Sequence, residues 1–211
     1  MRLPVPRVRA VPPEEWSGEA KEALGPVGTG SGFGALNIFR TLANYPKLAK
    51  RWMVFANHIL GKNSIAARER EILILRIGWL CSAEYEWAQH VVIGKREGLS
   101  DDEIKRIGVG PEAPGWSELD RALLRATDEL WNDAFVTDAT WAVLAKHLNQ
   151  QQLMDLVFTV GNYNLVSMAL NTLGVQLDAG LTGFPATAPP TAPAAPPTAA
   201  SSTVFDATSP L

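Results

Sequence analysis

Glu86 and His90 stand at a spacing that could move a proton. They are four residues apart, so a helix would place both side chains on one face, within hydrogen-bonding reach. A neighbouring carboxylate fixes the tautomer of an imidazole and favours its protonated form. Such a histidine can exchange a proton near neutral pH, as general acid–base catalysis requires. We predict His90 as a general acid/base that Glu86 orients.

Glu71 is the second carboxylate that could join this pair. It precedes the apolar stretch 72–80, and charged groups are rarely buried without partners. If the chain bends near Cys81, the segment that carries Glu71 can lie beside the segment that carries His90. We therefore predict a proton-transfer cluster of Glu71, Glu86 and His90, with Glu71 as a second proton carrier or a ligand-orienting group.

Two other interpretations of these residues stay open. A Glu–His pair at this spacing is common on solvated helix faces, where it contributes only a few tenths of a kcal/mol. A metal site would have two carboxylates and one imidazole, but the His-Glu-x-x-His pattern is absent. We predict neither a metal nor a cofactor.

Cys81 is the single cysteine of the chain, which excludes an internal disulfide. A free cysteine is often a small buried hydrophobe, whereas a nucleophilic one needs a lowered pKa. A peroxidase that used Cys81 would also need a thiol from outside this chain. We favour a structural or pocket-lining role and keep a catalytic role as the alternative.

Other side chains could contact a small-molecule substrate beside the cluster. Tyr85 and Trp87 would offer flat surfaces, and His58 and Asn162 could line the same pocket. His147 lies near an expected helix end, where a cation is favoured, so we interpret it as a capping residue.

The pattern of apolar residues predicts helices almost throughout and no strand of useful length. We expect a single all-α domain with its most apolar helix at the centre. Gly25-Pro26 should break the first helix, and Gly161 should interrupt or strain the last. The expected helices cover residues 12–24, 36–44, 47–60, 66–80, 84–97, 100–107, 117–132, 137–149 and 150–173.

The two ends of the chain differ from its middle in composition. We divide the chain into an N-terminal arm with a short helix and a Gly-rich loop (1–34), a helical domain (35–181) and a tail (182–211). The tail is rich in Ala, Pro and Thr and carries one charged side chain, so we predict that it is disordered.

The net charge of −3 gives no electrostatic case for binding nucleic acid or an anionic membrane. The N-terminus lacks the apolar core of a signal peptide, and we find no apolar run that we expect to span a bilayer. We expect a cytoplasmic protein.

Several stretches together resemble the carboxymuconolactone decarboxylase family, which has the alkylhydroperoxidase-D-like fold. They are residues 68–76, the motif CSAEYEWAQH (81–90) and residues 95–104, with flanking similarity at 36–52 and 155–175. The resemblance thus covers most of residues 36–177. It implies an all-α homo-oligomer, a trimer or a hexamer of two stacked trimers.

The resemblance also separates two branches of that family. The peroxidase branch has an upstream Glu, a Cys-x-x-Cys pair and a His four residues after the second Cys. With the pattern aligned on His90, Glu71 takes the Glu position, but Ala83 and Glu86 take the cysteine positions. This departure favours the decarboxylase-like branch, which acts on a small cyclic or lactone carboxylic acid by lyase, isomerase or cyclase chemistry. A thiol-dependent hydroperoxide reductase and a non-catalytic binding or assembly module are the alternatives.

Overall fold

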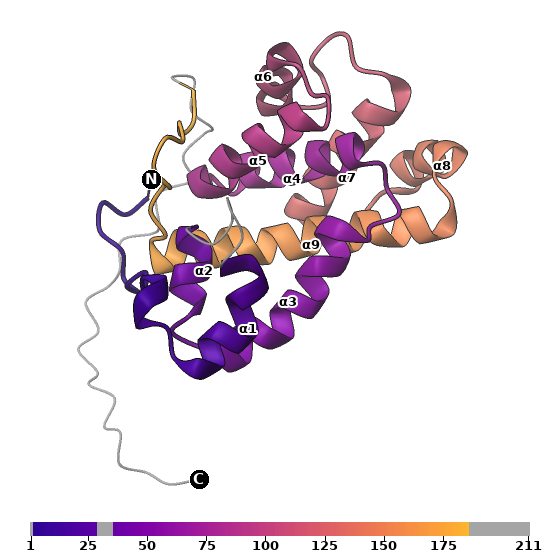
Figure 1. Cartoon of the computed structure of the whole chain (residues 1–211). Coiled ribbons are helices and arrows are strands. Elements are labelled where there is room, and N and C mark those ends of the chain that lie inside the picture. The colour runs from indigo at the N-terminus through magenta and orange to yellow at the C-terminus, as the bar shows by residue number, and fades with distance from the viewer. Residues whose placement is uncertain (1, 29–35, 186–211) are drawn as a thin grey trace, which may run out of the picture.

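The computed structural model of the protein describes residues 2–28 and 36–185, and within them it is all-helical, as predicted. Nine α-helices and one 3-10 turn follow one another there, without a strand (Figure 1). Their bounds are η1 Pro13–Glu15, α1 Gly18–Gly28, α2 Asn37–Leu42, α3 Pro46–Gly61, α4 Ala67–Leu80, α5 Glu84–Arg96, α6 Asp101–Val109, α7 Glu118–Asp133, α8 Asp138–His147 and α9 Gln150–Leu173.

Helix α4 forms the centre of the fold, as its apolar sequence predicted. Every residue from Arg70 to Trp79 is buried, and α5, α7 and α9 pack around this helix. A helix that is apolar on all sides must be covered on all sides. Arg70, Glu71 and Arg76 lie within this buried stretch of α4, where their charges need partners.

A tight bend separates α4 from α5. Cys81 ends α4, Ser82 takes the left-handed conformation with φ at 49°, and the Ala83 N–H donates to the Gly78 carbonyl at 2.8 Å. The chain then folds α5 back against α4. Gly94 lies at this contact, since a methyl group there would come within 3.7 Å of the Cβ of Glu71. The bend near Cys81, on which the approach of Glu71 to His90 depended, is thus present.

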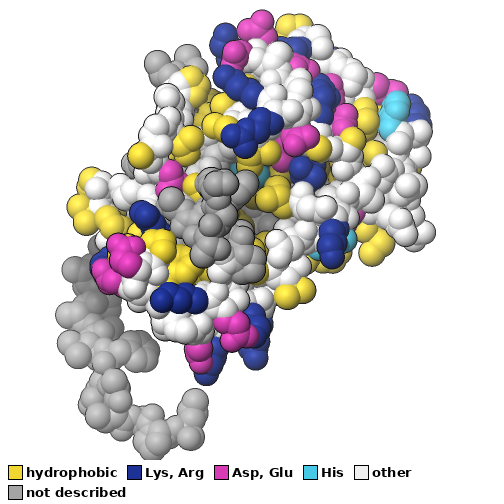
Figure 2. Space-filling model, viewed as in Figure 1, with side chains coloured by type: hydrophobic (Ala, Val, Ile, Leu, Met, Phe, Trp, Pro, Cys, Tyr) yellow, Lys and Arg dark blue, Asp and Glu magenta, His cyan; other side chains and the backbone are white. Residues whose placement is uncertain are grey.

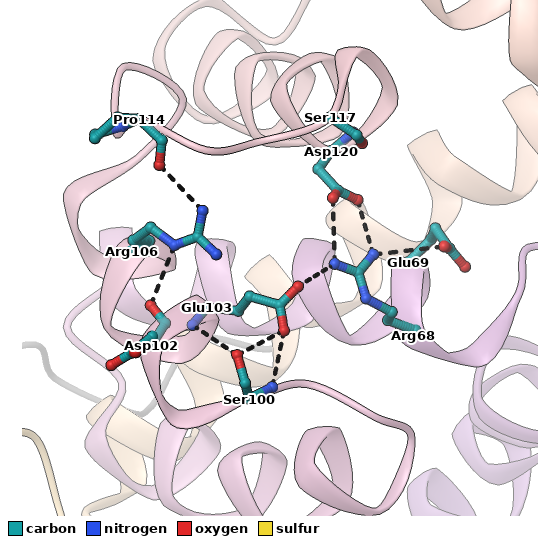
Figure 3. Close-up of polar contacts among 9 residues, drawn as sticks. All are labelled: Arg68, Glu69, Ser100, Asp102, Glu103, Arg106, Pro114, Ser117 and Asp120. Atoms are coloured by element: carbon teal, nitrogen blue, oxygen red, sulfur yellow. Dashed lines mark hydrogen bonds and ion pairs between the residues drawn. The ribbon is translucent and has the colours of Figure 1, made fainter.

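Ion pairs hold α6 and α7 against the start of α4 (Figure 3). The Arg68 guanidinium donates to Asp120 of α7 at 2.9 and 3.2 Å and to Glu103 of α6 at 2.5 Å. Glu103 also closes a capping box with Ser100 at the start of α6. These contacts are structural and lie outside the pocket described below.

Helix α9 crosses the whole width of the fold without interruption (Figure 1). The prediction of a break at Gly161 was wrong. Gly161 is exposed, and a glycine in a helix costs only about 1 kcal/mol, which the packing of α9 outweighs. The helix ends at Gly174, whose φ of 73° is a left-handed conformation that glycine adopts readily.

The N-terminal region differs from the single helix predicted for residues 12–24. Trp16 is extended, and its buried indole donates to the Val11 carbonyl. The Ser17 hydroxyl then accepts from the Ala20 N–H and starts α1 afresh. Helix α1 also continues through Gly25-Pro26 to Gly28, so the predicted break at Gly25-Pro26 was wrong.

The predicted Gly-rich loop and disordered tail lie almost wholly outside the described residues. The described start of the tail, 182–185, is packed onto the fold. The Phe184 ring centroid lies 5.3 Å from that of Trp79 and 5.6 Å from that of Trp87, and its N–H donates to Glu84. Aromatic packing therefore extends the ordered region beyond residue 181.

By length and composition alone, α9 could cross a membrane, contrary to the expectation that no apolar run was long enough. Half of its most apolar window is buried within the fold, and core helices pass the same test. On the face seen in Figure 2, acidic and basic side chains are interspersed, and neither sign of charge dominates.

Candidate active site

His90 is held between two buried carboxylates. Its Nδ1 lies 2.6 Å from Oε2 of Glu71 on α4, and its Nε2 lies 2.9 Å from Oε1 of Glu86, one turn earlier on α5. Glu71 is 0% exposed, Glu86 4% and His90 5%. The structure thus brings together the three residues that the sequence predicted as a cluster.

The two carboxylates keep the imidazole of His90 protonated. Burial by itself would lower its pKa, but the negative charges of Glu71 and Glu86 and the hydrogen bonds to them raise the pKa of His90 to about 10. Arg70 adds a second positive charge, because its Nε lies 3.4 Å from Oε1 of Glu71. Two cations therefore balance two carboxylates.

Both ring nitrogens of His90 are occupied by this arrangement. An imidazolium donates through both nitrogens, and here each donor faces a carboxylate oxygen. His90 therefore has no free nitrogen for a substrate while both contacts hold. It can instead pass a proton between Glu71 and Glu86, because one ring nitrogen contacts each carboxylate.

The cluster lies in the wall of a pocket of about 260 Å³ between α2, α3, α5 and α9. Glu86 and His90 both line this pocket, whereas Glu71 lies behind them. The remaining polar lining comes from Asn57, Tyr85, Gln89, Asn162 and Tyr163, and the other lining side chains are apolar. A small organic molecule could therefore contact the carboxyl group of Glu86 in largely apolar surroundings.

No Lys or Arg lines this pocket among the described residues. Residues 29–35 and 186–211, which the structure leaves undescribed, contain no Lys or Arg either. The charged groups that line the pocket are Glu86 and the imidazolium of His90, which is already paired with two carboxylates. The pocket thus lacks the cationic partner that a substrate carboxylate needs when it leaves water.

Tyr85 lines the pocket, as predicted, and a residue that the sequence did not suggest holds it there. The Tyr85 hydroxyl donates to Asp178 Oδ2 at 2.6 Å, and Gln89 donates to the same oxygen at 2.5 Å. Burial, the hydrogen bond to Asp178 and the charge of Asp178 all raise the pKa of Tyr85. Tyr85 therefore stays a neutral phenol. Asp178 also accepts from the Asn37 N–H at 2.8 Å and so ties the start of α2 to this wall.

Asn162 and Tyr163 contribute from α9. Asn162 lines the pocket, as predicted, and its Oδ1 accepts from the Trp52 indole at 3.2 Å. The Tyr163 ring meets the His90 ring edge to face at 5.0 Å. Burial, followed by the charges of Glu86 and Glu71, raises the pKa of Tyr163 well above 10.

Trp87 and His58, which we expected beside the substrate, lie elsewhere. The ring centroids of Trp87 and Trp79 lie 5.0 Å apart. Neighbouring residues on a helix point about 100° apart, so Trp87 points away from the pocket that Glu86 faces. His58 is half-exposed, and its Nε2 lies 2.9 Å from Asp155 Oδ1. Neither residue lines the pocket.

Cys81 also lies outside this pocket lining. Its thiol donates to Asn164 Oδ1 at 3.2 Å, and burial raises its pKa. The thiol therefore lacks the lowered pKa that an activated nucleophile needs. His147 ends α8, as predicted, and its Nε2 lies 2.9 Å from Glu118 Oε2.

Sequence reasoning assigned His58 of α3 to the pocket but missed the residues of α3 that do line it. Trp52, Ala56 and Leu60 all line it and recur every four residues, a periodicity that could have marked this face. Within the described parts of the chain, no group of three or more His, Cys, Asp or Glu side chains has the arrangement to hold a metal ion.

Comparison with protein families confirms the resemblance over the region that carries the cluster. Residues 46–129 match the model of the Carboxymuconolactone decarboxylase family. This region is a carboxymuconolactone decarboxylase family segment. It spans α3 to most of α7 and includes Glu71, Glu86 and His90. No curated protein matches the chain significantly.

Solved structures confirm the alkylhydroperoxidase-D-like fold. An uncharacterized peroxidase-related protein from Ralstonia eutropha JMP134, described as an alkylhydroperoxidase AhpD core, superposes with a TM-score of 0.72 at 18% identity, covering 84% of this chain and 94% of its own. An uncharacterized peroxidase-related protein from Silicibacter sp. TM1040 gives 0.63 at 15% identity, covering 84% and 92%. The debrominase Bmp8 gives 0.61 at 13% identity, covering 76% and 83%. At these identities the likeness concerns the fold.

Proposed function

We propose that this protein is an enzyme that transfers protons on a small organic molecule, with Glu86 as the group that meets the substrate. The observation that supports this most directly is the occupation of both His90 nitrogens by carboxylates, of which only Glu86 also lines the pocket. The chemistry needs no cofactor, and we place the enzyme in the cytoplasm.

The roles differ from those that spacing suggested. Glu86 accepts a proton from a carbon next to a carbonyl group: the C–H bond breaks, its electron pair moves into the carbonyl as an enolate, and an O–H bond forms on Glu86. His90 steadies the changing charge of Glu86 and passes a proton to or from Glu71. Returning the proton to another carbon completes an isomerisation with no loss of atoms.

Among the reactions that the resemblance implies, the pocket favours proton transfer on an uncharged substrate. A lactone carboxylate would bring a second negative charge beside Glu86, without a Lys or Arg to pair with it. Decarboxylation begins from such a carboxylate, so we rank it below isomerisation. A peroxidase centred on Cys81 ranks lower again, because the thiol lies outside the pocket and burial raises its pKa.

The test compares a neutral lactone with a charged one. α-Angelica lactone is uncharged and isomerises through proton transfer, whereas muconolactone carries a carboxylate. In D2O, the wild-type protein should accelerate deuterium uptake into α-angelica lactone, followed by NMR, and should act on it faster than on muconolactone. Glu86→Gln should reduce the rate about 10²–10⁴-fold.

Glu97→Gln, an exposed change at the end of α5, is the matched control and should retain the rate. Equal rates for wild type and Glu86→Gln would refute the assigned role. Binding of the lactone without exchange would support the non-catalytic binding module.

We also propose that the protein forms a homo-oligomer, as the family resemblance implies. Exposed hydrophobic side chains on α3 and α9 support this, including Val54 at 74% and Phe158 at 54% exposed, because large exposed apolar areas often mark interfaces. Light scattering on the full chain should give the mass of a trimer or hexamer, and a monomer at micromolar concentration would refute it.

A further inference from the structure

A second cavity adjoins the active-site pocket. It has a volume of about 160 Å³ and lies between α2, α3 and α9. Apart from Thr41, every side chain that lines it is apolar. Ile38, Trp52 and Val166 line both cavities, so the two spaces lie on either side of these shared side chains.

The volume of the second cavity indicates the size of its occupant. An apolar cavity of about 150 Å³ in another protein stays dry and binds benzene. The second cavity here is similar in volume and in the apolar character of its lining, but it opens to solvent beside Leu48 and Leu165, which are 50% and 52% exposed. It therefore suits a hydrocarbon group of about six carbons and offers almost nothing to a polar or charged one.

The two cavities together make different demands on one molecule. The active-site pocket presents Glu86 and several hydrogen-bonding groups but no Lys or Arg, while the second cavity presents only apolar surface beyond Thr41. A ligand that satisfies both must be uncharged and must have a polar, reactive end and an apolar end.

We propose that the substrate is an uncharged amphipathic molecule, with its reactive end beside Glu86 and an apolar substituent of about six carbons in the second cavity. The assignment of the reactive end rests on the proposed function. The assignment of the apolar end rests on the second cavity alone, so binding tests it separately from turnover.

Calorimetric titration of the full chain with 4-alkylphenols from phenol to 4-octylphenol tests the proposal, because these probes are neutral at pH 7. Affinity should rise by up to about fourfold for each added methylene and level off near six carbons. The matching 4-alkylbenzoates should bind about tenfold or more weakly, because they bring a carboxylate to Glu86. A flat series, or tighter binding of the benzoates, would overturn the proposal.

Ala169 offers a way to fill only the second cavity. It lines that cavity, is absent from the lining of the active-site pocket, and lies at an exposed position on α9. Ala169→Phe should remove the gain in affinity from chain length while leaving phenol binding unchanged. Ala169→Ser is the matched control and should keep the wild-type series.

Two further outcomes separate this proposal from its competitors. If Ala169→Phe changes the mass of the protein in light scattering but leaves the alkylphenol series intact, a second copy of the chain covers the cavity and the proposal is wrong. If the series behaves as expected while Glu86→Gln does not reduce lactone exchange, the amphipathic site stands and the catalytic role of Glu86 fails.

Discussion

Replacing Glu71 with glutamine should lower the pKa of His90 while leaving the imidazole in place. Glutamine has nearly the shape of glutamate and can still accept a hydrogen bond from Nδ1 of His90, but it carries no charge. Glu86 would then be the only carboxylate in contact with the ring. The change therefore isolates the electrostatic contribution of one buried charge.

The magnitude follows from the geometry. Glu71 Oε2 lies 2.6 Å from Nδ1, and Glu71 is 0% exposed, so water screens the pair little. An opposite charge this close raises the pKa of a histidine by about 1–3 pH units. From the wild-type value of about 10, we expect Glu71→Gln to lower the pKa of His90 by about 2 pH units. This corresponds to about 3 kcal/mol of interaction with the imidazolium.

Proton NMR of the imidazole C–H groups between pH 5 and pH 11 measures this directly. The chain has three histidines, and a His90→Gln spectrum identifies the signal of His90. Glu118→Gln removes an exposed carboxylate beside His147 and should leave the titration of His90 unchanged. If wild-type His90 titrates near 6.5, or if Glu71→Gln does not move its pKa, the charge-bridged imidazole is refuted.

Three other predictions concern stability and the thiol. Because the folded pKa of His90 lies above the unfolded value of 6.5, its stabilising contribution is complete below pH 6.5 and is lost towards pH 10. Between these pH values, the free energy of unfolding measured in urea should fall by up to about 1.4 kcal/mol per pH unit. His90→Gln should abolish that slope. Arg76→Met should cost about 3–5 kcal/mol in urea unfolding, because buried Arg76 donates to Asp128 at 2.6 and 2.9 Å and to two backbone carbonyls; an effect below about 1 kcal/mol would contradict this. Cys81→Ser should leave any peroxide turnover unchanged, and a loss of that turnover would restore the peroxidase hypothesis.

Local patterns predicted the helical fold well, because they report physics that acts within a few residues. Helix α6 starts and helix α9 ends near the expected residues 100 and 173, at the capping box of Ser100 and at Gly174. The errors arose where packing outweighed local preference. Gly161 does not interrupt α9. The burial of Trp16 helps to end the turn η1, and Ser17 then starts α1.

The candidate site was predictable in its members but not in its connections. Four-residue spacing was enough to pair Glu86 with His90, and the apolarity around Glu71 indicated that it needed a buried partner. Asp178, which holds Tyr85 in the pocket wall, gave no such signal, because 93 residues separate the two in the chain. Contacts of that range depend on how the helices pack.

The sequence by itself predicted that Glu71, Glu86 and His90 would meet in an apolar, helical protein, because charges in apolar helices need partners. Only the tertiary structure decided how they meet. The bend after α4 places one carboxylate on each ring nitrogen of His90, which leaves Glu86 as the group that meets the pocket. The packing of α2, α3, α5 and α9 also decided that none of the described Lys or Arg side chains lines the pocket and that an apolar cavity adjoins it. These features depend on distances between segments far apart in the chain, which residue spacing does not encode.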